Sequence, residues 1–420
     1  MRLALGLAHR WAGLFIAVFL AISGFTGAII SWDHELDEWL NPDLFETKSV
    51  GPTLDPLELV RSVEASDPKV EVVYFPTTFE PGHTALLGLG PRLDPKTGRP
   101  FELDYNQVYV DPVTGEHVGK RLWGKISLSR QDLLPFLYKL HFSMHIPEIG
   151  GIDRFGFWFM GIIAIVWTID CLVGFYLTLP QRRQLQAGVR GPHGRSWWER
   201  WKPAWRIKRG ADSYRLNLDL HRAFGLWLWV LLFVVAFSSI SMNLGDLVVR
   251  PLVSAVADLT PDPFDDRTPL DRTKQIPAQV SRAQILDIGA KEAQARGWPE
   301  SIKSVYYGRS YGLYSVTYAL PGDDHGAFGM QKRLFFDGAD GAVVGGRVPW
   351  EGTAGDVFMQ LQFPLHSGRI AGIPGRVAIS LLGFVVALLS VTGIVVWAKK
   401  RAARQSAVSR RQIGVPQAAE

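Results

Sequence analysis

Four long apolar stretches alternate with polar segments along this chain of 420 residues. They cover Trp11–Trp32, Phe155–Leu179, Ala223–Leu244 and Val377–Trp397. A helix needs about 20 predominantly apolar residues to cross a bilayer, so each stretch is long enough to be a membrane span. The first stretch is too long for a cleaved signal sequence, and no A-x-A cleavage site follows it. We therefore expect it to stay in the protein as an anchor.

The two long polar segments between these stretches share a second pattern. Apolar positions recur at helical spacing in 54–66 and in 280–297, which predicts one helix in each segment. Each helix is followed by a strand, a turn around Asp-x-x-x-Gly and another strand, in "VYVDPVTGEHVGKR" (108–121) and "LFFDGADGAVVGGR" (334–347). This arrangement is typical of a β-hairpin. Each polar segment is therefore expected to fold as a small α+β domain.

The distribution of charge predicts the orientation in the membrane. The loop 181–215 carries ten Lys and Arg against two acids, and the tail after Trp397 carries six against one. The polar segments 33–153 and 245–375 hold more acids than bases. Because positive residues stay on the cytoplasmic side, both termini and the middle loop are expected inside and the two α+β domains outside. The net charge of +5 is segregated by loop, so we expect no nucleic-acid partner.

The chain repeats one plan twice, which is helix, outer domain, helix. Both halves start with H-R-x-x-G, at residues 9–13 and 221–225. Both outer domains end on related segments, "LHFSMHIPEIGGI" (140–152) and "LQFPLHSGRIAGI" (361–373). Repeats of this kind often place a binding site at their interface. The predicted units are helix 9–32, outer domain 33–153, helix 154–180, basic cytoplasmic loop 181–218, helix 219–244, outer domain 245–375, helix 376–398 and cytoplasmic tail 399–420.

Histidines at the ends of the membrane helices are the main candidates for chemistry. His9 and His221 lie at the predicted cytoplasmic ends of the first and third helices. Neutral imidazole is a common axial ligand of haem iron, and paired histidines on facing helices hold haem well inside a bundle. The Gly one turn later lets a flat ring approach the backbone, and Arg10 and Arg222 can pair with haem propionates. We predict that His9 and His221 are haem ligands.

A second layer of histidines is expected at the outer ends of the helices. Alignment of the repeats sets His145 against His366, whereas His141 meets Gln362. Repeat symmetry therefore favours His145 and His366 as ligands of a second haem iron, with His141 and His34 as alternatives. Two layers of paired histidines would give one haem near each membrane face and a path for electrons across the membrane.

Each candidate also has an ordinary structural explanation. His, Trp and Arg are common at membrane interfaces, and Arg10 and Arg222 satisfy the positive-inside rule without any ligand. Anchoring does not require H-R-x-x-G in both halves, so that repeat favours ligation. Asp170, inside the second apolar stretch, is expected to face a cavity, a proton path, a quinol or a neighbouring helix. The basic, Trp-rich stretch 196–205 is expected to lie on the cytoplasmic face.

Several of these motifs together resemble the PepSY-associated transmembrane family. They are the HR-x-x-G helix starts, "LDEWLNP" (36–42), "VDPVTG" (110–115) and "PLHSGRIAG" (364–372), and the resemblance runs from Leu7 to about Lys400. Within this family the chain is most similar to inner-membrane ferric-siderophore reductases of Gram-negative bacteria. The resemblance implies a four-helix membrane domain, periplasmic PepSY-type domains and haem in the membrane. It also implies four haem-iron ligands, which are His9, His221, His145 and His366.

The sequence therefore predicts a multi-pass oxidoreductase of the bacterial inner membrane with two haem b groups per chain. Electrons from a quinol or a cytoplasmic reductase would reduce a ferric siderophore or a similar ferric chelate in the periplasm and release Fe(II). Two alternatives without redox activity remain open, a PepSY protein that binds or regulates a periplasmic partner and an accessory of siderophore uptake. Residues that can either line the chelate site or pack in a core are Tyr306, Tyr307, Arg309 and Tyr311.

Overall fold

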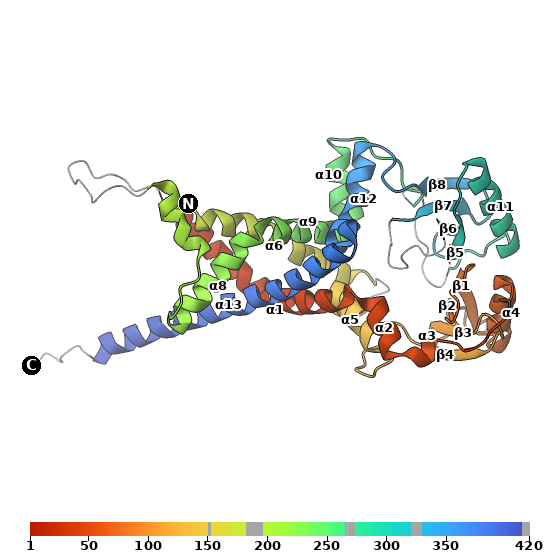
Figure 1. The fold of residues 1–420 in the computed structure, drawn as a ribbon, viewed down its shortest axis with the longest axis horizontal. Coiled ribbons are helices and arrows are strands. Elements are labelled where there is room, and N and C mark those ends of the chain that lie inside the picture. Colours follow the sequence, from red (N-terminus) through yellow and green to blue (C-terminus); the bar gives the residue numbers. More distant parts are fainter. Residues whose placement is uncertain (150–152, 182–195, 265–266, 268–273, 321–329, 414–420) are drawn as a thin grey trace, which may run out of the picture.

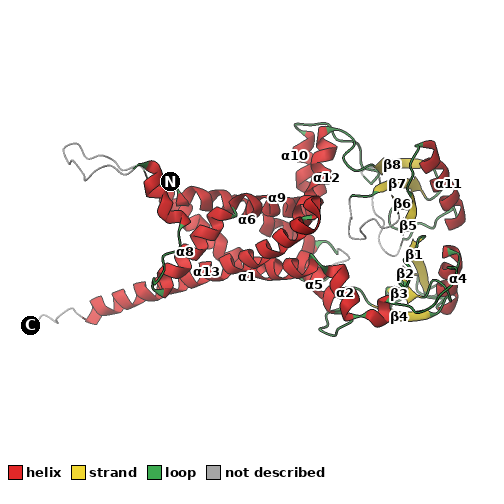
Figure 2. Cartoon of the chain, in the orientation of Figure 1, coloured by secondary structure: helices red, strands yellow, loops and turns green. Residues whose placement is uncertain are grey.

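The computed structural model describes residues 1–149, 153–181, 196–264, 267, 274–320 and 330–413. Its long helices form an elongated bundle, and its strands form a sheet beyond one end of that bundle (Figure 1). The start of α1 (Arg2–Ile30) and the described end of α13 (Gly372–Ile413) lie at the opposite end (Figure 1). We call these two ends the sheet end and the terminal end. The strands gather at one end of the long axis, with helices beside them (Figure 2).

Among the described residues, four helical segments are long and apolar enough to span a membrane. The first is α1 and the second is α6 (Phe155–Thr178). The third joins α9 (Trp229–Leu244), the π-turn η2 (Gly245–Val249) and α10 (Arg250–Ser254), and the fourth lies within η3 (Arg369–Ala371) and α13. Large apolar side chains on these helices point outward, as expected for helices surrounded by lipid. Examples are Phe15, Ile169 and Leu381.

The third apolar stretch is divided into two helices. α8 (Ser213–Trp227) ends before Leu228, which has φ −109° and ψ 13°, and α9 begins after it. His221 and Arg222 therefore lie on α8, ahead of the segment that is long enough to span a membrane. The single helix predicted over 219–244 is thus a terminal-end segment followed by a membrane segment.

Glycines allow the membrane helices to approach closely. A Cβ placed on Gly24 of α1 would lie 2.5 Å from the carbonyl oxygen of Gly383 on α13, and the reciprocal contact is equally close. A side chain does not fit at this crossing, as is common where small residues bring membrane helices together. α6 packs against α9, where Gly161 accommodates the side chain of Leu244. The centre of the bundle is filled by Ile16, Leu20, Met160, Ile163, Leu232, Leu382 and Val386.

Eight strands form one antiparallel sheet in the order β4-β3-β2-β1-β5-β6-β7-β8. The predicted hairpins are confirmed as β3–β4 and β7–β8. The two four-strand halves meet at β1 and β5, where Tyr74 pairs with Tyr306 and Phe75 with Val305. The α+β units predicted from the sequence are thus joined edge to edge. The strands are β1 (Val70–Pro76), β2 (Ala85–Pro91), β3 (Gln107–Val110), β4 (His117–Arg121), β5 (Ser301–Gly308), β6 (Leu313–Ala319), β7 (Lys332–Asp337) and β8 (Val343–Arg347).

One helix from each half covers the same face of the sheet (Figure 1). These helices are α4 (Pro56–Ser66) and α11 (Arg282–Ala295), and they confirm the two helices predicted in the polar segments. Each begins at a capping side chain, Asp55 for α4 and Ser281 for α11, that accepts a hydrogen bond from the first turn. Both helices contribute to one apolar core with the strands, so the two halves fold as a single unit at this end.

Short helices connect the bundle to the sheet (Figure 1). They are α2 (Asp33–Leu40), α3 (Pro42–Phe45), α5 (Leu133–Ser143) and α12 (Ala354–Ser367). Arg376 at the start of α13 binds both carboxylate oxygens of Glu35, at 2.6 and 2.7 Å, and donates to the carbonyl oxygen of Ser31. Arg121 of β4 binds Asp37 at 2.7 Å, with both side chains buried. α2 is therefore tied to α13 on one side and to the sheet on the other.

Candidate functional site

A cavity of about 1130 Å³ opens between the helices at the terminal end. Its lining comes from α1, α6, α8, α9 and α13 and includes the His, Arg and Gly of both H-R-x-x-G segments, 9–13 and 221–225. A Cβ placed on Gly225 would meet no atom within 4 Å, and one placed on Gly13 would lie 3.9 Å from the Asp170 carboxylate. The two glycines therefore border open space. Folding brings the two motifs, more than two hundred residues apart in the sequence, to one cavity.

His9 and His221 form a pair in this cavity, which we call the terminal pair. Their ring centres are 6.2 Å apart and their planes are inclined by 62°. Nδ1 of His9 donates to Oδ1 of Asp170 on α6 at 2.8 Å, and Nδ1 of His221 donates to the carbonyl oxygen of Leu389 on α13 at 2.9 Å. The Nε2 atoms have no hydrogen-bond partner among the described residues. An imidazole held through its Nδ1–H presents Nε2 to a metal ion.

A second pair, which we call the sheet-side pair, consists of His141 at the end of α5 and His366 at the end of α12. Its ring centres are also 6.2 Å apart, with the planes inclined by 62°. Nδ1 of His141 donates to the carbonyl oxygen of Ser23 at 2.9 Å. Nδ1 of His366 lies 3.1 Å from Ser238 Oγ and also bonds the carbonyl oxygen of Val235, one turn earlier on α9. The sheet-side pair therefore has the same arrangement as the terminal pair.

The two pairs lie at different depths along the bundle. His9 belongs to α1, and Ser23, which holds His141, is on the same helix 14 residues later. At 1.5 Å per residue these two positions are about 21 Å apart along the helix axis. The pairs are thus separated by most of the thickness of a bilayer core, which is about 30 Å.

Glycines on neighbouring helices support three of the four imidazoles. A Cβ on Gly174 of α6 would lie 3.4 Å from Cε1 of His9, and a Cβ on Gly393 of α13 would lie 3.3 Å from Cε1 of His221. The contact at Gly27 of α1 is tighter, since a Cβ there would lie 2.8 Å from Cε1 of His141. The absence of a side chain at Gly27 is therefore required for the position of His141.

His145 and His34, two further histidines predicted as candidates, do not join either pair. His145 follows α5 with φ 52°, stacks on the ring of Phe136 at 4.9 Å and contacts the Phe136 carbonyl through Nε2 at 3.0 Å. His34 lies on α2 beside Glu38, at 3.3 Å, and its ring contacts Phe45. The structure thus brings His141 to His366, where repeat symmetry had favoured His145. The helix ends at Met144 and His145 in left-handed conformations, which turns His145 back onto its own helix.

The two arginines of the repeated motif both line the terminal cavity. Arg222 donates to Asp219 at 3.0 Å and to the carbonyl oxygen of Pro203 at 2.6 Å. Arg10 lies over the ring of Trp11 at 5.2 Å. The Nε atoms of Arg10 and Arg222 are buried and have no hydrogen-bond partner among the described residues. Buried unpaired donors are costly, so the cavity has two positions suited to an anionic acceptor.

The paired imidazoles fit the geometry of a haem site. A metal–imidazole bond is about 2 Å long and the bonded nitrogen lies roughly 1 Å from the ring centre, so two imidazoles on opposite sides of one ion have centres about 6 Å apart. Both observed separations are 6.2 Å. Within the described part of the chain no three His, Cys, Asp or Glu side chains converge on one point, so the histidines meet in twos. The open cavity, its glycines and the two unpaired arginine donors match a planar ligand with acidic groups.

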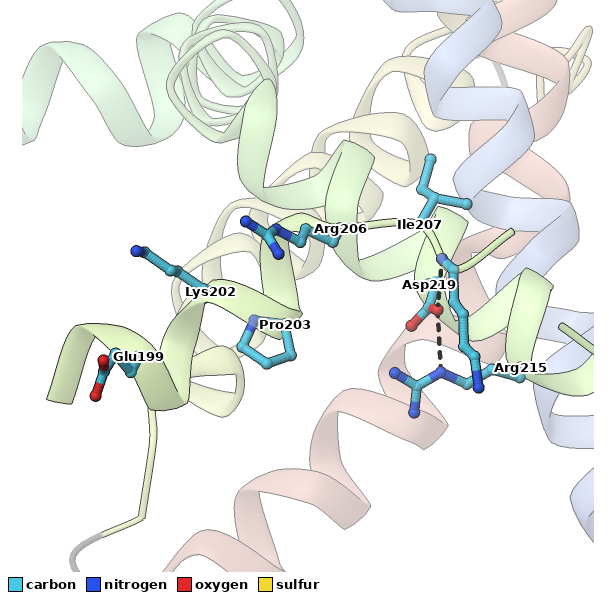
Figure 3. Close-up of a pocket in the computed structure, with 8 residues that line it drawn as sticks. Glu199, Lys202, Pro203, Arg206, Ile207, Arg215 and Asp219 are labelled. Carbon is cyan, nitrogen blue, oxygen red and sulfur yellow. Dashed lines mark hydrogen bonds and ion pairs between the residues drawn. The ribbon is translucent and has the colours of Figure 1, made fainter. Parts of the chain in front are cut away.

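A smaller hollow of about 500 Å³ lies at the terminal end, beside α7 (Trp197–Trp201) and η1 (Lys202–Trp205). Figure 3 shows the buried carboxylate of Asp219 between Arg215 and the backbone of residue 208. The same carboxylate holds Arg222 of the terminal cavity. The hollow therefore belongs to the structure that fixes Arg222. The predicted basic loop 181–218 falls partly, at 182–195, outside the described residues.

The tyrosines and the arginine predicted either to line a chelate site or to pack in a core have different surroundings. Tyr307 is buried in the core of the sheet and donates to the Ile276 carbonyl oxygen at 3.0 Å. Arg309 is held by Glu71 and by the Pro91 carbonyl oxygen. Tyr311 packs on Phe264. Tyr306, in contrast, is 48% exposed on the strand that joins the two halves.

Asp170, expected from the sequence to face a cavity or a neighbouring helix, lines the terminal cavity and bonds His9 on α1. The structure adds a set of glycines that were not identified from the sequence. Asp170 is the hydrogen-bond partner of His9, and its isolated charge in an apolar stretch was the only signal of that role. Gly27, Gly174 and Gly393 contact the imidazoles directly. No sequence pattern marks them, because glycines are frequent in membrane helices for many reasons.

Comparison with known proteins identifies the family. The model of the PepSY-associated TM region matches residues 7–400, which is nearly the whole chain. Comparison with curated proteins gives no match. The chain therefore belongs to the PepSY-associated TM family and is a membrane protein.

Proposed function

We propose that this PepSY-associated membrane protein is a haem-containing oxidoreductase of the bacterial inner membrane. It would pass electrons across the membrane to a ferric chelate, such as a ferric siderophore, and release Fe(II). The observation that carries the proposal is the pair of matched histidine sites, each with ring centres 6.2 Å apart and each Nδ1 fixed by a neighbouring helix.

Each residue of the two sites has a definite task under this proposal. His9 and His221 hold one haem b through Nε2, and His141 and His366 hold a second. The unpaired donors of Arg10 and Arg222 bind acidic groups at the terminal site. Bound haem supplies one-electron chemistry, since its iron alternates between Fe(III) and Fe(II). Hydroxamate and phenolate oxygens are hard ligands that hold Fe(III) better than Fe(II), so reduction favours release of the metal.

The arrangement of the helices supports two repeated halves. His9 and His141 come from the first half and His221 and His366 from the second, so each site takes one ligand from each half. The sheet has the same division, with four strands and one covering helix per half. We propose that these two units are the PepSY-type domains. That the two units are homologous to PepSY domains is part of this proposal.

The charge distribution supports one orientation in the membrane. The described part of the basic loop, from residue 196 onward, and the described end of α13 both lie at the terminal end. Positive residues remain in the cytoplasm, so the terminal pair would face the cytoplasm and the sheet would face the periplasm. The electron donor at the cytoplasmic side would be a quinol or a reductase, and the chelate would bind on the sheet side.

The proposal is tested by the absorption spectrum of the full-length protein purified in mild detergent from haem-replete cells. We expect about two haems per chain and a sharp band on reduction with dithionite. His9→Ala and His221→Ala should each remove one haem, and His141→Ala and His366→Ala should each remove the other. His34→Ala and His145→Ala are matched controls that should retain both, because neither residue joins a pair.

Activity is tested with the same preparation. Dithionite-reduced protein, freed of excess reductant, should convert a ferric hydroxamate chelate to Fe(II), which a colorimetric Fe(II) chelator traps. A colourless protein would overturn the proposal and leave a PepSY protein that binds or regulates a partner. A protein with two haems that reduces no ferric chelate would overturn the substrate class alone.

A further inference from the structure

The four paired histidines differ in one respect, which is the charge of the group that holds Nδ1. His221, His141 and His366 each bond a backbone carbonyl and lie beside a Ser or Thr hydroxyl, all of them neutral groups. His9 donates to the carboxylate of Asp170 at 2.8 Å. Among the described residues, the terminal pair therefore has an anion behind one imidazole and the sheet-side pair has only neutral acceptors.

Asp170 has little other structural use. It lies on α6 within a membrane span, its side chain is 12% exposed, and His9 is its one ion-pair partner among the described residues. A carboxylate at such a position is costly, and residues of this kind are usually functional. An asparagine would accept the same hydrogen bond without the charge. The negative charge at this position therefore needs an explanation beyond holding the ring.

A carboxylate that accepts the Nδ1–H hydrogen bond of a histidine ligand changes the electronic properties of that ligand. It increases the basicity of the imidazole, and it acts through the ring on the metal behind it. A haem with two neutral imidazoles carries one more positive charge when oxidised than when reduced. A nearby anion therefore stabilises the oxidised form and lowers the reduction potential, which second-shell hydrogen bonds are known to control.

We infer that Asp170 is a positioning residue for His9 that sets the terminal site at a lower reduction potential than the sheet-side site. The inference rests on the proposed function, since it requires a haem in each pair. Each transfer would move one electron between the two sites. The difference makes transfer favourable from the terminal end to the sheet end.

The cations that line the terminal cavity act in the opposite direction, and they are Arg2, Arg10, Arg222, Lys400, Arg401 and Arg404. Arg10 and Arg222 line the same cavity and would raise the potential of a group bound there. Arg222 is already paired with the buried carboxylate of Asp219, and the open donors of both arginines point to an anionic partner. Among the charges around the cavity, that of Asp170 is hydrogen-bonded directly to a histidine of the pair. Comparing variants of Asp170 also leaves these cations unchanged.

The experiment is a potentiometric titration of the purified full-length protein, followed through the absorption band of the reduced haem. We expect two one-electron waves. His366→Ala should retain the lower wave and His221→Ala the higher one. Asp170→Asn keeps an acceptor for Nδ1 and removes the charge. It should raise the midpoint potential of the lower wave by at least about 59 mV. For one electron this shift corresponds to a tenfold change in the ratio of oxidised to reduced protein.

Two further variants separate charge from position. Asp170→Glu should restore a midpoint close to that of the unaltered protein. Ser238→Ala removes one of the neutral groups that contact Nδ1 of His366 and should affect only the higher wave. If Asp170→Asn loses the terminal haem altogether, the order of the two midpoints in the unaltered protein decides the inference.

The inference fails in two ways that differ from failure of the proposed function. A terminal midpoint at or above the sheet-side midpoint would overturn it. An unchanged lower wave in Asp170→Asn would also overturn it. A protein that shows no haem wave at all would overturn the proposed function instead.

Discussion

Replacing Gly27 by alanine should remove the sheet-side haem while leaving the terminal one in place. A Cβ at this position would lie 2.8 Å from Cε1 and 3.3 Å from Nδ1 of His141. Carbon atoms in contact are separated by at least about 3.5 Å, so the imidazole must move by about 0.7 Å or more. Movement away from α1 stretches the 2.9 Å bond between Nδ1 and the Ser23 carbonyl oxygen. At about 3.6 Å that hydrogen bond is lost.

Two independent magnitudes apply to this change. Overpacking of a well-packed site costs about 1–3 kcal/mol. Loss of the hydrogen-bond partner of a metal-binding histidine lowers metal affinity by about 10- to 100-fold, which is about 1.4–2.8 kcal/mol. The two estimates agree, so the affinity of the sheet-side pair for haem should fall by at least tenfold. The terminal pair is about 21 Å away along α1 and should not respond.

The assay is haem content per chain, measured from the reduced spectrum of protein purified at limiting haem. Gly27→Ala should resemble His141→Ala, with one haem in place of two. Gly245→Ala is the matched control, because a Cβ at Gly245 meets no atom within 4 Å. Full haem content and an unshifted sheet-side midpoint in Gly27→Ala would refute the argument that this glycine positions His141.

Three further predictions concern the connection between the bundle and the sheet. Arg376→Met removes the charged hydrogen bonds to Glu35 and should destabilise the protein by about 2–3 kcal/mol. The loss should appear as a lower melting temperature in detergent, and an unchanged melting temperature would contradict the role of this contact. Arg376 lowers the pKa of Glu35 in the folded state below its ordinary value of 4.5. The ion pair therefore stabilises the fold fully above pH 4.5, and this stabilisation is lost as the pH falls through the lowered pKa of the folded state. Glu35→Gln should therefore lose less stability than the unaltered protein on acidification, and identical pH profiles would exclude this linkage. Arg121→Leu leaves the buried Asp37 carboxylate without its cation and should cost about 3 kcal/mol, measured by limited proteolysis of the sheet; equal protease resistance would count against it.

The sequence was informative about the histidine sites where the two halves carry the same motif. H-R-x-x-G placed His9 and His221 in matching positions, and the structure brings them together. The ends of the outer domains were less informative, because alignment matched His145 with His366. Which histidine pairs with His366 depends on where α5 ends and on how the chain turns at Met144. That turn requires a backbone with positive φ. Such a turn without glycine leaves no clear mark in a sequence.

The fold was predictable to a similar extent. Long apolar runs and the two hairpins follow from local patterns, and the described helices and strands confirm them. The junction of β1 with β5 does not follow from any local pattern. Strand edges pair according to the shape of the assembled halves, and the residues that meet there are separated by more than two hundred positions. The partner of Asp170 could not be predicted for the same reason, since it depends on the contact between α1 and α6.

The central junction of the sheet has a consequence for the synthesis of the protein. β1 ends at Pro76 and its partner β5 begins at Ser301, about 225 residues later. At about 5–20 residues per second, the ribosome needs roughly 10 to 45 s to make the intervening chain. During this interval the first half presents an open strand edge, which is a template for pairing with other chains. The first half therefore remains prone to aggregation until the second half has been made. We expect that the two halves must be inherited, expressed and engineered together.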